Sequence, residues 1–152
     1  MLPTPKKYFV TSGAAEGSSC LNAFDNALLA ARIGNVNIIR VSSILPPGTE
    51  YDQDLILPPG SLVPTAYGAT VSDIPGELIA AAVGVGISRE SFGVIMEYSG
   101  KCSAKEAQEK VEHMIREAFR SREMEVVEIK MSAVEHCVKE IGCVLAAVPL
   151  WY

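Results

Sequence analysis

The fold is decided by a stretch that reads as strand, helix and strand, KYFVTSGAAEGSSCLNAFDNALLAARIGNVNIIRVSSI, which spans residues 7–44. Residues 7–11 carry Tyr, Phe and Val in succession, which favours a strand, and Ser12-Gly13 is expected to interrupt it. Residues 36–44 are rich in Val and Ile and predict a second strand.

Between these strands, residues 20–32 are expected to form a helix, because apolar side chains recur there at helical spacing. Ser18 or Ser19 can cap the start of the helix, and Gly34 is expected to end it. The apolar positions that should face the core are Leu21, Phe24, Leu28 and Ala31.

A later stretch has the same order. Residues 92–98 predict a strand that ends at Ser99-Gly100, and Ser103 begins a capping box for a helix that runs to about Arg122. Strands are expected over residues 125–133 and 142–150. The core face of this helix is expected to contain Ala107, Val111, Met114, Ile115 and Ala118. The similarity of the two units indicates an internal duplication and a layered α+β domain.

The middle of the chain is rich in Pro and Gly. Residues 45–48 and 57–60 read as turns around a short polar segment. Residues 62–67 and 69–72 are expected to be strand pieces, and residues 78–85 a buried strand whose small side chains allow close packing.

Composition narrows the class of protein. The 152 residues fit one domain, residues 1–152, and 49% of them are hydrophobic, which is enough for a sizeable core. The net charge of −5 argues against nucleic acid as a partner, because phosphate binding requires clustered Lys and Arg. The apolar runs are too short to span a bilayer and the start does not resemble a secretory signal, so a soluble, cytoplasmic protein without a membrane partner is expected.

Motifs for metal or nucleotide chemistry are weak. The four cysteines form no CxxC pair and fit no common zinc pattern, so we expect reduced thiols and no metal. Gly84-Val85-Gly86 lacks the third glycine of a dinucleotide fingerprint, and no Gly-x-Ser-x-Gly elbow is present.

One segment has a chemical interpretation: an apolar strand runs into Ser42-Ser43 and then into Ile-Leu-Pro-Pro-Gly. Two small polar residues at a strand end before a turn are the ordinary interpretation. Alternatively, the hydroxyl of Ser43 attacks the Ser42 carbonyl, strain weakens the amide, and elimination leaves a pyruvoyl group at position 43.

The segment resembles the self-cleavage site of pyruvoyl-dependent arginine decarboxylases, a family known best from archaea. Asn37, six residues before Ser43, stands where that family has an asparagine that assists processing. Glu97 matches its catalytic glutamate. The positions that match its substrate pocket are Leu21, Asp25, Gly34 and Val36.

The resemblance implies a four-layer α/β/β/α sandwich built from a duplicated β-α-β-β unit. It implies cleavage into residues 1–42 and 43–152, a covalent pyruvoyl group from Ser43, and a homotrimer with active sites between subunits. Arginine would be decarboxylated to agmatine, a step in polyamine synthesis, with Glu97 as general acid and Asp25 as partner of the guanidinium. Ser42 would become a new carboxyl terminus whose hydroxyl lines the site.

Alternatives stay open for the protein and for its residues. The substrate could be histidine or another amino acid, or the chain could remain uncleaved and serve as a binding or assembly subunit. Glu97 could be a carboxylate paired with Arg or Lys at a strand end. Asp25 could be an exposed helix residue, and Asn37 a polar residue on the solvent face of a strand.

Overall fold

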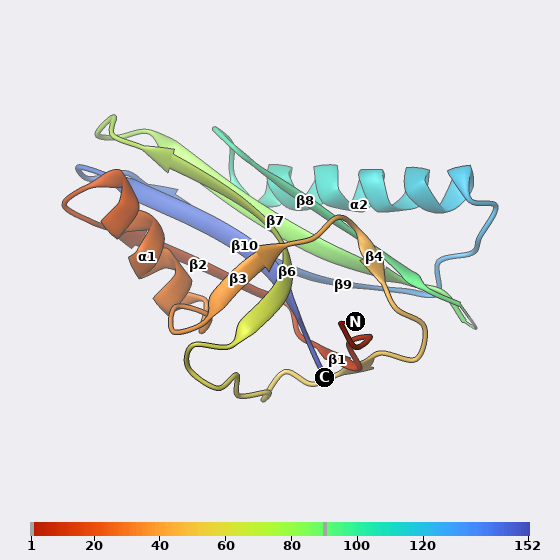
Figure 1. The fold of residues 1–152 in the computed structure, drawn as a ribbon. Helices are drawn as coiled ribbons and strands as arrows, with labels where there is room; N and C mark the ends of the chain where they lie inside the picture. Colours follow the sequence, from red (N-terminus) through yellow and green to blue (C-terminus); the bar gives the residue numbers. More distant parts are fainter. Residues whose placement is uncertain (1, 90) are drawn as a thin grey trace.

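The computed structural model describes residues 2–89 and 91–152. Its two most apolar strands, β7 (Leu78–Ile87) and β10 (Gly142–Trp151), are buried on both faces along almost their whole length. Such continuous apolar runs suit the middle of a sheet that is covered on both sides. β7 and β10 are the central strands of two sheets that pack face to face (Figure 1).

The first sheet has the order β3-β6-β10-β1-β5, and β2 also pairs with β10. The other strands of this sheet are β1 (Lys7–Tyr8), β2 (Thr11–Glu16), β3 (Asn37–Arg40), β5 (Glu50–Tyr51) and β6 (Leu62–Ser72). The second sheet has the order β4-β8-β7-β9. Its other strands are β4 (Ile44–Leu45), β8 (Gly93–Gly100) and β9 (Glu128–Cys137).

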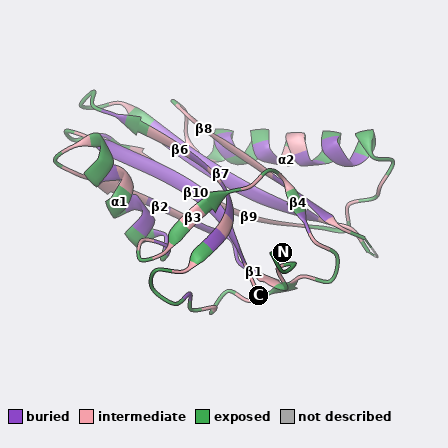
Figure 2. Cartoon of the chain, in the orientation of Figure 1, coloured by how far each residue is buried: buried purple, intermediate pink, exposed green. Residues whose placement is uncertain are grey.

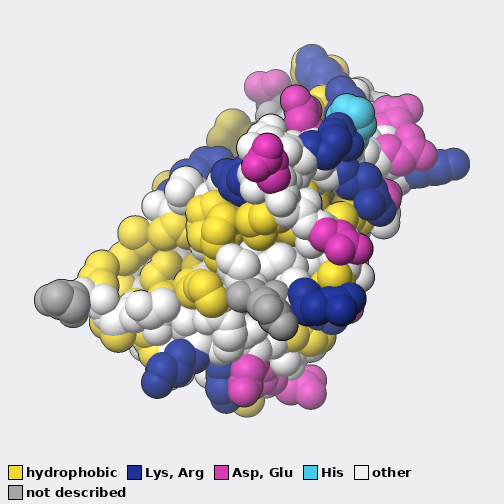
Figure 3. All heavy atoms as spheres, turned by 90° about the vertical axis from the view of Figure 1, so that its right-hand side faces the viewer, with side chains coloured by type: hydrophobic (Ala, Val, Ile, Leu, Met, Phe, Trp, Pro, Cys, Tyr) yellow, Lys and Arg dark blue, Asp and Glu magenta, His cyan; other side chains and the backbone are white. Residues whose placement is uncertain are grey.

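Three apolar clusters separate four layers, so the α/β/β/α sandwich is confirmed. One cluster lies between helix α1 (Cys20–Ala30) and the first sheet, one between the two sheets, and one between the second sheet and helix α2 (Ala104–Ser121). The buried residues of Figure 2 follow the same layers: the central strands are buried, and the helices carry both buried and exposed residues. Toward the top of Figure 3, at the height of α2 in Figure 1, acidic and basic side chains gather on the surface.

The two helices begin as the sequence predicts. The Ser19 hydroxyl accepts a hydrogen bond from the Asn22 N–H at 3.1 Å, and Ser103 and Glu106 form the complete capping box of α2. On α2 the expected core positions are buried except Met114, which is half-buried. Gly84 and Gly86 face this helix: a Cβ on either would stand less than 3 Å from the Ile115 side chain, so these glycines serve helix packing.

The end and the core face of α1 differ from the prediction. The helix ends at Ala30, before Gly34, because Arg32 adopts the left-handed conformation with φ of 66°. Leu21 was expected in the core, but its side chain is 76% exposed. Its place is on the flank of α1 rather than above the sheet, where Ala23 and Ala27 are fully buried.

The predicted strand break at Ser12-Gly13 is wrong, whereas β8 ends within the predicted Ser99-Gly100 pair, at Gly100. Residues 7–8 and 11–16 run along β10 in one register, and β8 continues to Gly100 opposite Ala80. Gly13 is small for another reason: a Cβ there would stand 2.5 Å from the Ala27 carbonyl oxygen of α1. The glycine allows α1 to pack closely on the strand without interrupting it.

Other strands differ in length from the sequence prediction. The strand expected over residues 36–44 is divided between β3 and β4, which belong to different sheets. The two pieces expected over residues 62–72 form the single strand β6, and β9 begins three residues later than expected and extends to Cys137.

The duplication is visible in the topology. β2, α1, β6 and β7 correspond in order to β8, α2, β9 and β10. In the first sheet, β2 and β6 of the first unit lie on either side of β10, the last strand of the second unit. In the second sheet, β8 and β9 of the second unit lie on either side of β7, the last strand of the first unit. The two units have therefore exchanged their last strands, and β3 and β4 are additions at the sheet edges.

Within residues 2–89 and 91–152, no helix has both the length and the apolar character required to cross a membrane.

Candidate active site at the crossing between the sheets

The chain passes from one sheet to the other at Ser42. β3 runs parallel to β6, and its last main-chain bond is donated by the Val41 N–H to the Thr65 carbonyl at 3.2 Å. The Ser43 carbonyl then accepts a hydrogen bond from the Ile95 N–H of β8 at 2.7 Å, and β4 continues along that strand. The exposed Ser42 lies between these two anchors, so the Ser42–Ser43 peptide bridges the two sheets.

Glu97 occupies the space between the sheets. It lies on β8 opposite Val83, and its side chain points toward Gly68 of β6: a Cβ added to Gly68 would be 3.2 Å from Glu97 Cγ. The carboxylate side chain is 26% exposed. Burial raises the pKa of Glu97 above its ordinary value, although the nearby Arg40 charge offsets part of the rise.

Ser43 and Glu97 are brought together by β8. Ile95, which binds the Ser43 carbonyl, lies two residues before Glu97 on the same strand. Side chains two residues apart in a strand share a face, and Ile95 belongs to the core between the sheets. A half-buried carboxyl group therefore lies on the strand that binds the serine at which cleavage is predicted, two residues beyond that hydrogen bond.

Arg40 ends β3 and is the charged neighbour of Glu97. Its Nη2 lies 4.0 Å from Glu97 Oε1 and donates a hydrogen bond to the Tyr67 carbonyl at 2.8 Å. The guanidinium also stacks over the Tyr67 ring, with Cζ 4.5 Å from the ring centroid. The Tyr67 ring in turn contacts the Phe24 ring of α1.

The predicted substrate residues lie elsewhere on the same chain. Leu21 and Asp25 are one helical turn apart on the exposed flank of α1. Gly34 and Val36 follow that helix and line a hollow of about 330 Å³ together with Leu57. In the described part of the chain, no hydrogen bond or ion pair joins these four residues to Ser43 or Glu97.

Asn37 is the first residue of β3. In the sequence it lies between the predicted substrate residues and the predicted cleavage site. Its side-chain Nδ2 donates to the Gly60 carbonyl at 3.1 Å, and its main-chain N–H donates to the Ser61 carbonyl at 2.8 Å. No hydrogen bond among the described residues joins Asn37 to Ser42 or Ser43. Its role in processing stays a prediction.

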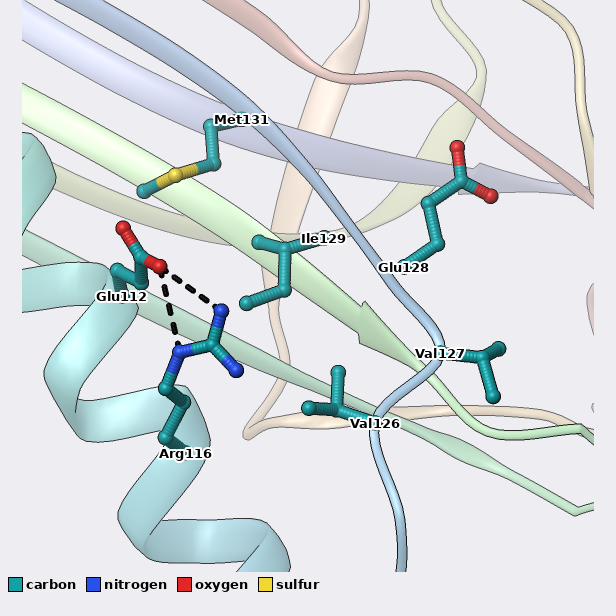
Figure 4. A pocket seen from close by; sticks show the side chains of 7 residues that line it. All are labelled: Glu112, Arg116, Val126, Val127, Glu128, Ile129 and Met131. Atoms are coloured by element: carbon teal, nitrogen blue, oxygen red, sulfur yellow. Dashed lines mark hydrogen bonds and ion pairs between the residues drawn. The ribbon is translucent and has the colours of Figure 1, made fainter.

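A further hollow, of about 350 Å³, lies between α2 and β9 and contains none of these residues (Figure 4). Its two charges from α2 are already paired, because Arg116 Nη2 lies 2.9 Å from Glu112 Oε1. In Figure 4 the Glu128 side chain points away from this pair, on the other side of the strand. The hollow offers no uncompensated group for catalysis.

Known proteins of similar sequence indicate the family of this chain. Residues 7–152 match the family model described as pyruvoyl-dependent arginine decarboxylase. The chain is 51% identical over 150 residues to the pyruvoyl-dependent arginine decarboxylase of Methanocaldococcus jannaschii, a match that covers 97% of this chain and 91% of the relative. The proteins of the same name from Thermococcus kodakarensis and Pyrococcus furiosus are 44% and 46% identical, over 98% and 90% of this chain and 96% and 89% of their own lengths.

The chain belongs to the pyruvoyl-dependent arginine decarboxylase family. Membership implies a covalently bound pyruvoyl group, and the crossing between the sheets fits one derived from Ser43. The carbonyl of residue 43 is held by β8, whereas the residue before it is exposed. A break before Ser43 would thus leave the new end fixed beside Glu97.

Two members of the site were missed from the sequence of this decarboxylase-family chain. Arg40 contacts both Tyr67 and Glu97 only because β3, β6 and β8 meet in space. One signal was available for Arg40: it is the single charged side chain in the apolar run before Ser42. Gly68 gave no signal, since its role depends on the opposite sheet.

Proposed function

We propose that this chain cuts its own backbone between Ser42 and Ser43 and that the processed protein decarboxylates L-arginine to agmatine and carbon dioxide. The observation that carries the proposal is the position of Ser43 at the crossing between the sheets, held by Ile95 two residues from Glu97. The family supports arginine as the substrate.

Cleavage needs only atoms of the chain and one water molecule. The Ser43 Oγ attacks the Ser42 carbonyl carbon, so the amide becomes an ester and the Ser43 amine is freed. Loss of the Cα proton of residue 43 then expels Ser42 as a carboxylate and leaves a carbon–carbon double bond at residue 43. Water displaces the nitrogen of that residue as ammonia, and a pyruvoyl group remains. Anchors on both sides of Ser42 hold this peptide in place.

The bound pyruvoyl group supplies a carbonyl that takes the substrate amine covalently and accepts the electrons released with carbon dioxide. Glu97 supplies the proton that the reacting carbon then needs. Burial suits Glu97 to this task, because a raised pKa keeps the carboxyl protonated at a higher pH than an ordinary glutamate.

Asp25 is proposed to bind the guanidinium group of the substrate, since a carboxylate can accept two parallel hydrogen bonds from it. Because no hydrogen bond or ion pair among the described residues joins Asp25 to Glu97 within one chain, we propose that they meet between neighbouring subunits of a homotrimer. Large apolar side chains are exposed beside both groups: Leu21 is 76% exposed near Asp25, and Ile39 and Ile44, which flank the crossing, are 43% and 42% exposed.

Denaturing gel electrophoresis tests the cleavage. Purified protein should give two fragments, of 42 and 110 residues out of 152. Ser43→Ala should remain intact because the attacking hydroxyl is gone. Ser42→Ala is the matched control and should still be cut, since only the carbonyl of residue 42 reacts. Intact wild-type protein after long incubation would favour a binding or assembly subunit.

The substrate is tested by measuring carbon dioxide from arginine, histidine, lysine and ornithine with fully processed protein. Strong release from arginine alone is expected. Histidine, without the guanidinium group, should be a poor substrate, and Asp25→Asn should lose the preference for arginine. Preferential release from another amino acid would contradict the proposed substrate while leaving the processing chemistry intact.

A further inference from the structure

Arg40 makes three contacts, and each joins it to a residue on the other side of the proposed cleavage between Ser42 and Ser43. It belongs to residues 1–42, whereas Glu97 and Tyr67, its partners through charge, hydrogen bond and ring stacking, belong to residues 43–152. Two residues separate Arg40 from the bond between Ser42 and Ser43. After cleavage, Arg40 would thus be close to the free end of the shorter fragment.

Tyr67 holds the Arg40 guanidinium group in two ways. The Tyr67 carbonyl accepts its Nη2 hydrogen at 2.8 Å, and the Tyr67 ring lies beneath its plane. A planar cation with several fixed donors can make both contacts and still direct a donor edge at a carboxylate. Lysine carries the charge but offers neither the plane nor the fork.

The surroundings of Glu97 leave Arg40 as its charged neighbour among the described residues. On β7 the cross-strand neighbour is Val83, and on β6 the facing residue is Gly68, so neither adjoining strand presents a titratable group there. The Ser99 hydroxyl, which also lies near Gly68, is not titratable and accepts a hydrogen bond from Thr70 at 2.9 Å. The position and charge of Arg40 therefore act directly on the Glu97 carboxylate.

We propose that Arg40 is a positioning residue: its guanidinium group, fixed by Tyr67, orients the Glu97 carboxyl beside Ser43 and ties the carboxyl-terminal end of residues 1–42 to the rest of the protein. This inference rests on the proposed function for the role of Glu97 as proton donor. The contact between Arg40 and Glu97 can be tested without that role.

The first experiment does not require activity. In Ser43→Ala protein labelled with ¹³C at the glutamate carboxyls, the signal of Glu97 is assigned by its loss in Glu97→Gln and titrated by NMR. Adding Arg40→Met should move the titration of Glu97 to higher pH, because the opposing positive charge is lost. Arg40→Lys should move it less. Arg116→Met, which removes an arginine paired with Glu112 on α2, is the control and should leave it unchanged.

The second experiment uses processed protein. With Arg40→Met, kcat should fall roughly tenfold to a hundredfold, because Glu97 loses its fixed orientation, and the alkaline limb of the pH profile should move to higher pH. Arg40→Lys should restore the alkaline limb more fully than kcat, since it restores charge without the fork. Circular dichroism checks that each variant folds, and Arg116→Met should behave as wild type.

The two experiments separate the two proposals. Glu97 titrating at the same pH with and without Arg40, or unchanged kcat and pH profile in Arg40→Met, would overturn the role of Arg40. A shifted titration together with wild-type protein that releases no carbon dioxide from arginine would instead contradict the proposed function and leave the Arg40–Glu97 relationship standing.

Discussion

Gly68 and Glu97 approach each other across the space between the two sheets. A Cβ at residue 68 would stand 3.2 Å from Glu97 Cγ and 3.4 Å from Glu97 Cβ. Few side-chain contacts are that short, so the Glu97 side chain occupies space that a hydrogen atom on Gly68 leaves open. The position of the proposed proton donor therefore depends on a residue that carries no functional group.

Gly68→Ala is expected to lower kcat by roughly tenfold or more, because the added methyl group displaces the Glu97 carboxyl from its place beside Ser43. Steady-state kinetics with processed protein measures the change. Gly100→Ala is the matched control: its methyl group would stand 3.2 Å from the Tyr98 hydroxyl, an equally short contact that does not involve Glu97. Equal losses in the two variants would mean that the effect is one of packing in general.

The raised pKa of Glu97 predicts a stability that depends on pH. The carboxyl favours the protonated form in the folded protein, so its contribution to stability is complete at low pH and is lost as pH rises through the folded-state pKa. Glu97→Gln, which stays neutral, should therefore be more stable than wild type at pH 8 and similar to it near pH 4. Thermal unfolding across this pH range measures the difference; a deficit for Glu97→Gln at pH 8 would contradict it.

Mixed trimers test the proposed sharing of the site between subunits. Asp25→Asn and Glu97→Gln should each be nearly inactive alone. When the two variants are unfolded together and refolded, random association should restore roughly a quarter of wild-type activity, because each mixed trimer contains one site with both native residues.

The control for this experiment is a mixture of Ser43→Ala and Glu97→Gln. Ile95 joins Ser43 and Glu97 within one chain, so each subunit of this mixture lacks one of the two and no activity should return. If activity returns in the control mixture, or fails to return in the Asp25→Asn and Glu97→Gln mixture, the proposed sharing of Asp25 between subunits would be contradicted.

Glu16 links the two sheets at the other end of the molecule. It accepts hydrogen bonds from the Glu140 N–H at 2.7 Å and, at 2.6 Å, from His136 of β9 when that ring nitrogen is protonated. Partial burial works against its charge, but the hydrogen bonds outweigh burial and hold the pKa of Glu16 below its usual range. Stability from this group is therefore present above the unfolded pKa and lost as pH falls through the folded one.

Glu16→Gln is accordingly expected to lower Tm by about 2–4 °C near pH 7, equivalent to about 1 kcal/mol. The difference from wild type should shrink as pH falls toward 3. Glu125→Gln, at an exposed glutamate that forms no ion pair with residues 2–89 and 91–152, should change Tm little at any pH. If the Tm difference between Glu16→Gln and wild type stays constant with pH, the ionised Glu16 carboxylate is not the cause of that difference.

The layers and helices could be predicted from the sequence because they depend on local chemistry. The Ser103 cap and the apolar period of α2 act within a few residues, and both are confirmed. The break expected at Ser12-Gly13 was wrong because glycine can serve either a turn or close packing. At Gly13 it permits close contact with α1 rather than a turn, and only the helix above the strand distinguishes these uses.

The candidate site, too, could be predicted only in part, because some of its contacts join elements that are far apart in the sequence. Ser43 and Glu97 could be named by resemblance to a family; β8 binds the Ser43 carbonyl two residues before Glu97, and the roles of both residues stay predictions. The contacts of Arg40 with Glu97 and Tyr67 depend on the chain leaving one sheet for the other after β3, whereas residues 36–44 were expected to form one continuous strand. In the proposed homotrimer Asp25 would reach the site from a neighbouring subunit, and the pattern of one chain carries no signal for such a contact.

The exchange of β7 and β10 between the two repeats has a consequence for ancestry. Neither repeat can complete a sheet from its own strands, since the central strand always comes from the other. An unduplicated ancestor with this topology would have required a second copy to fold, each copy lending its last strand to its partner. Fusion of two such copies into one chain would have converted a concentration-dependent pairing into an intramolecular one without altering either sheet.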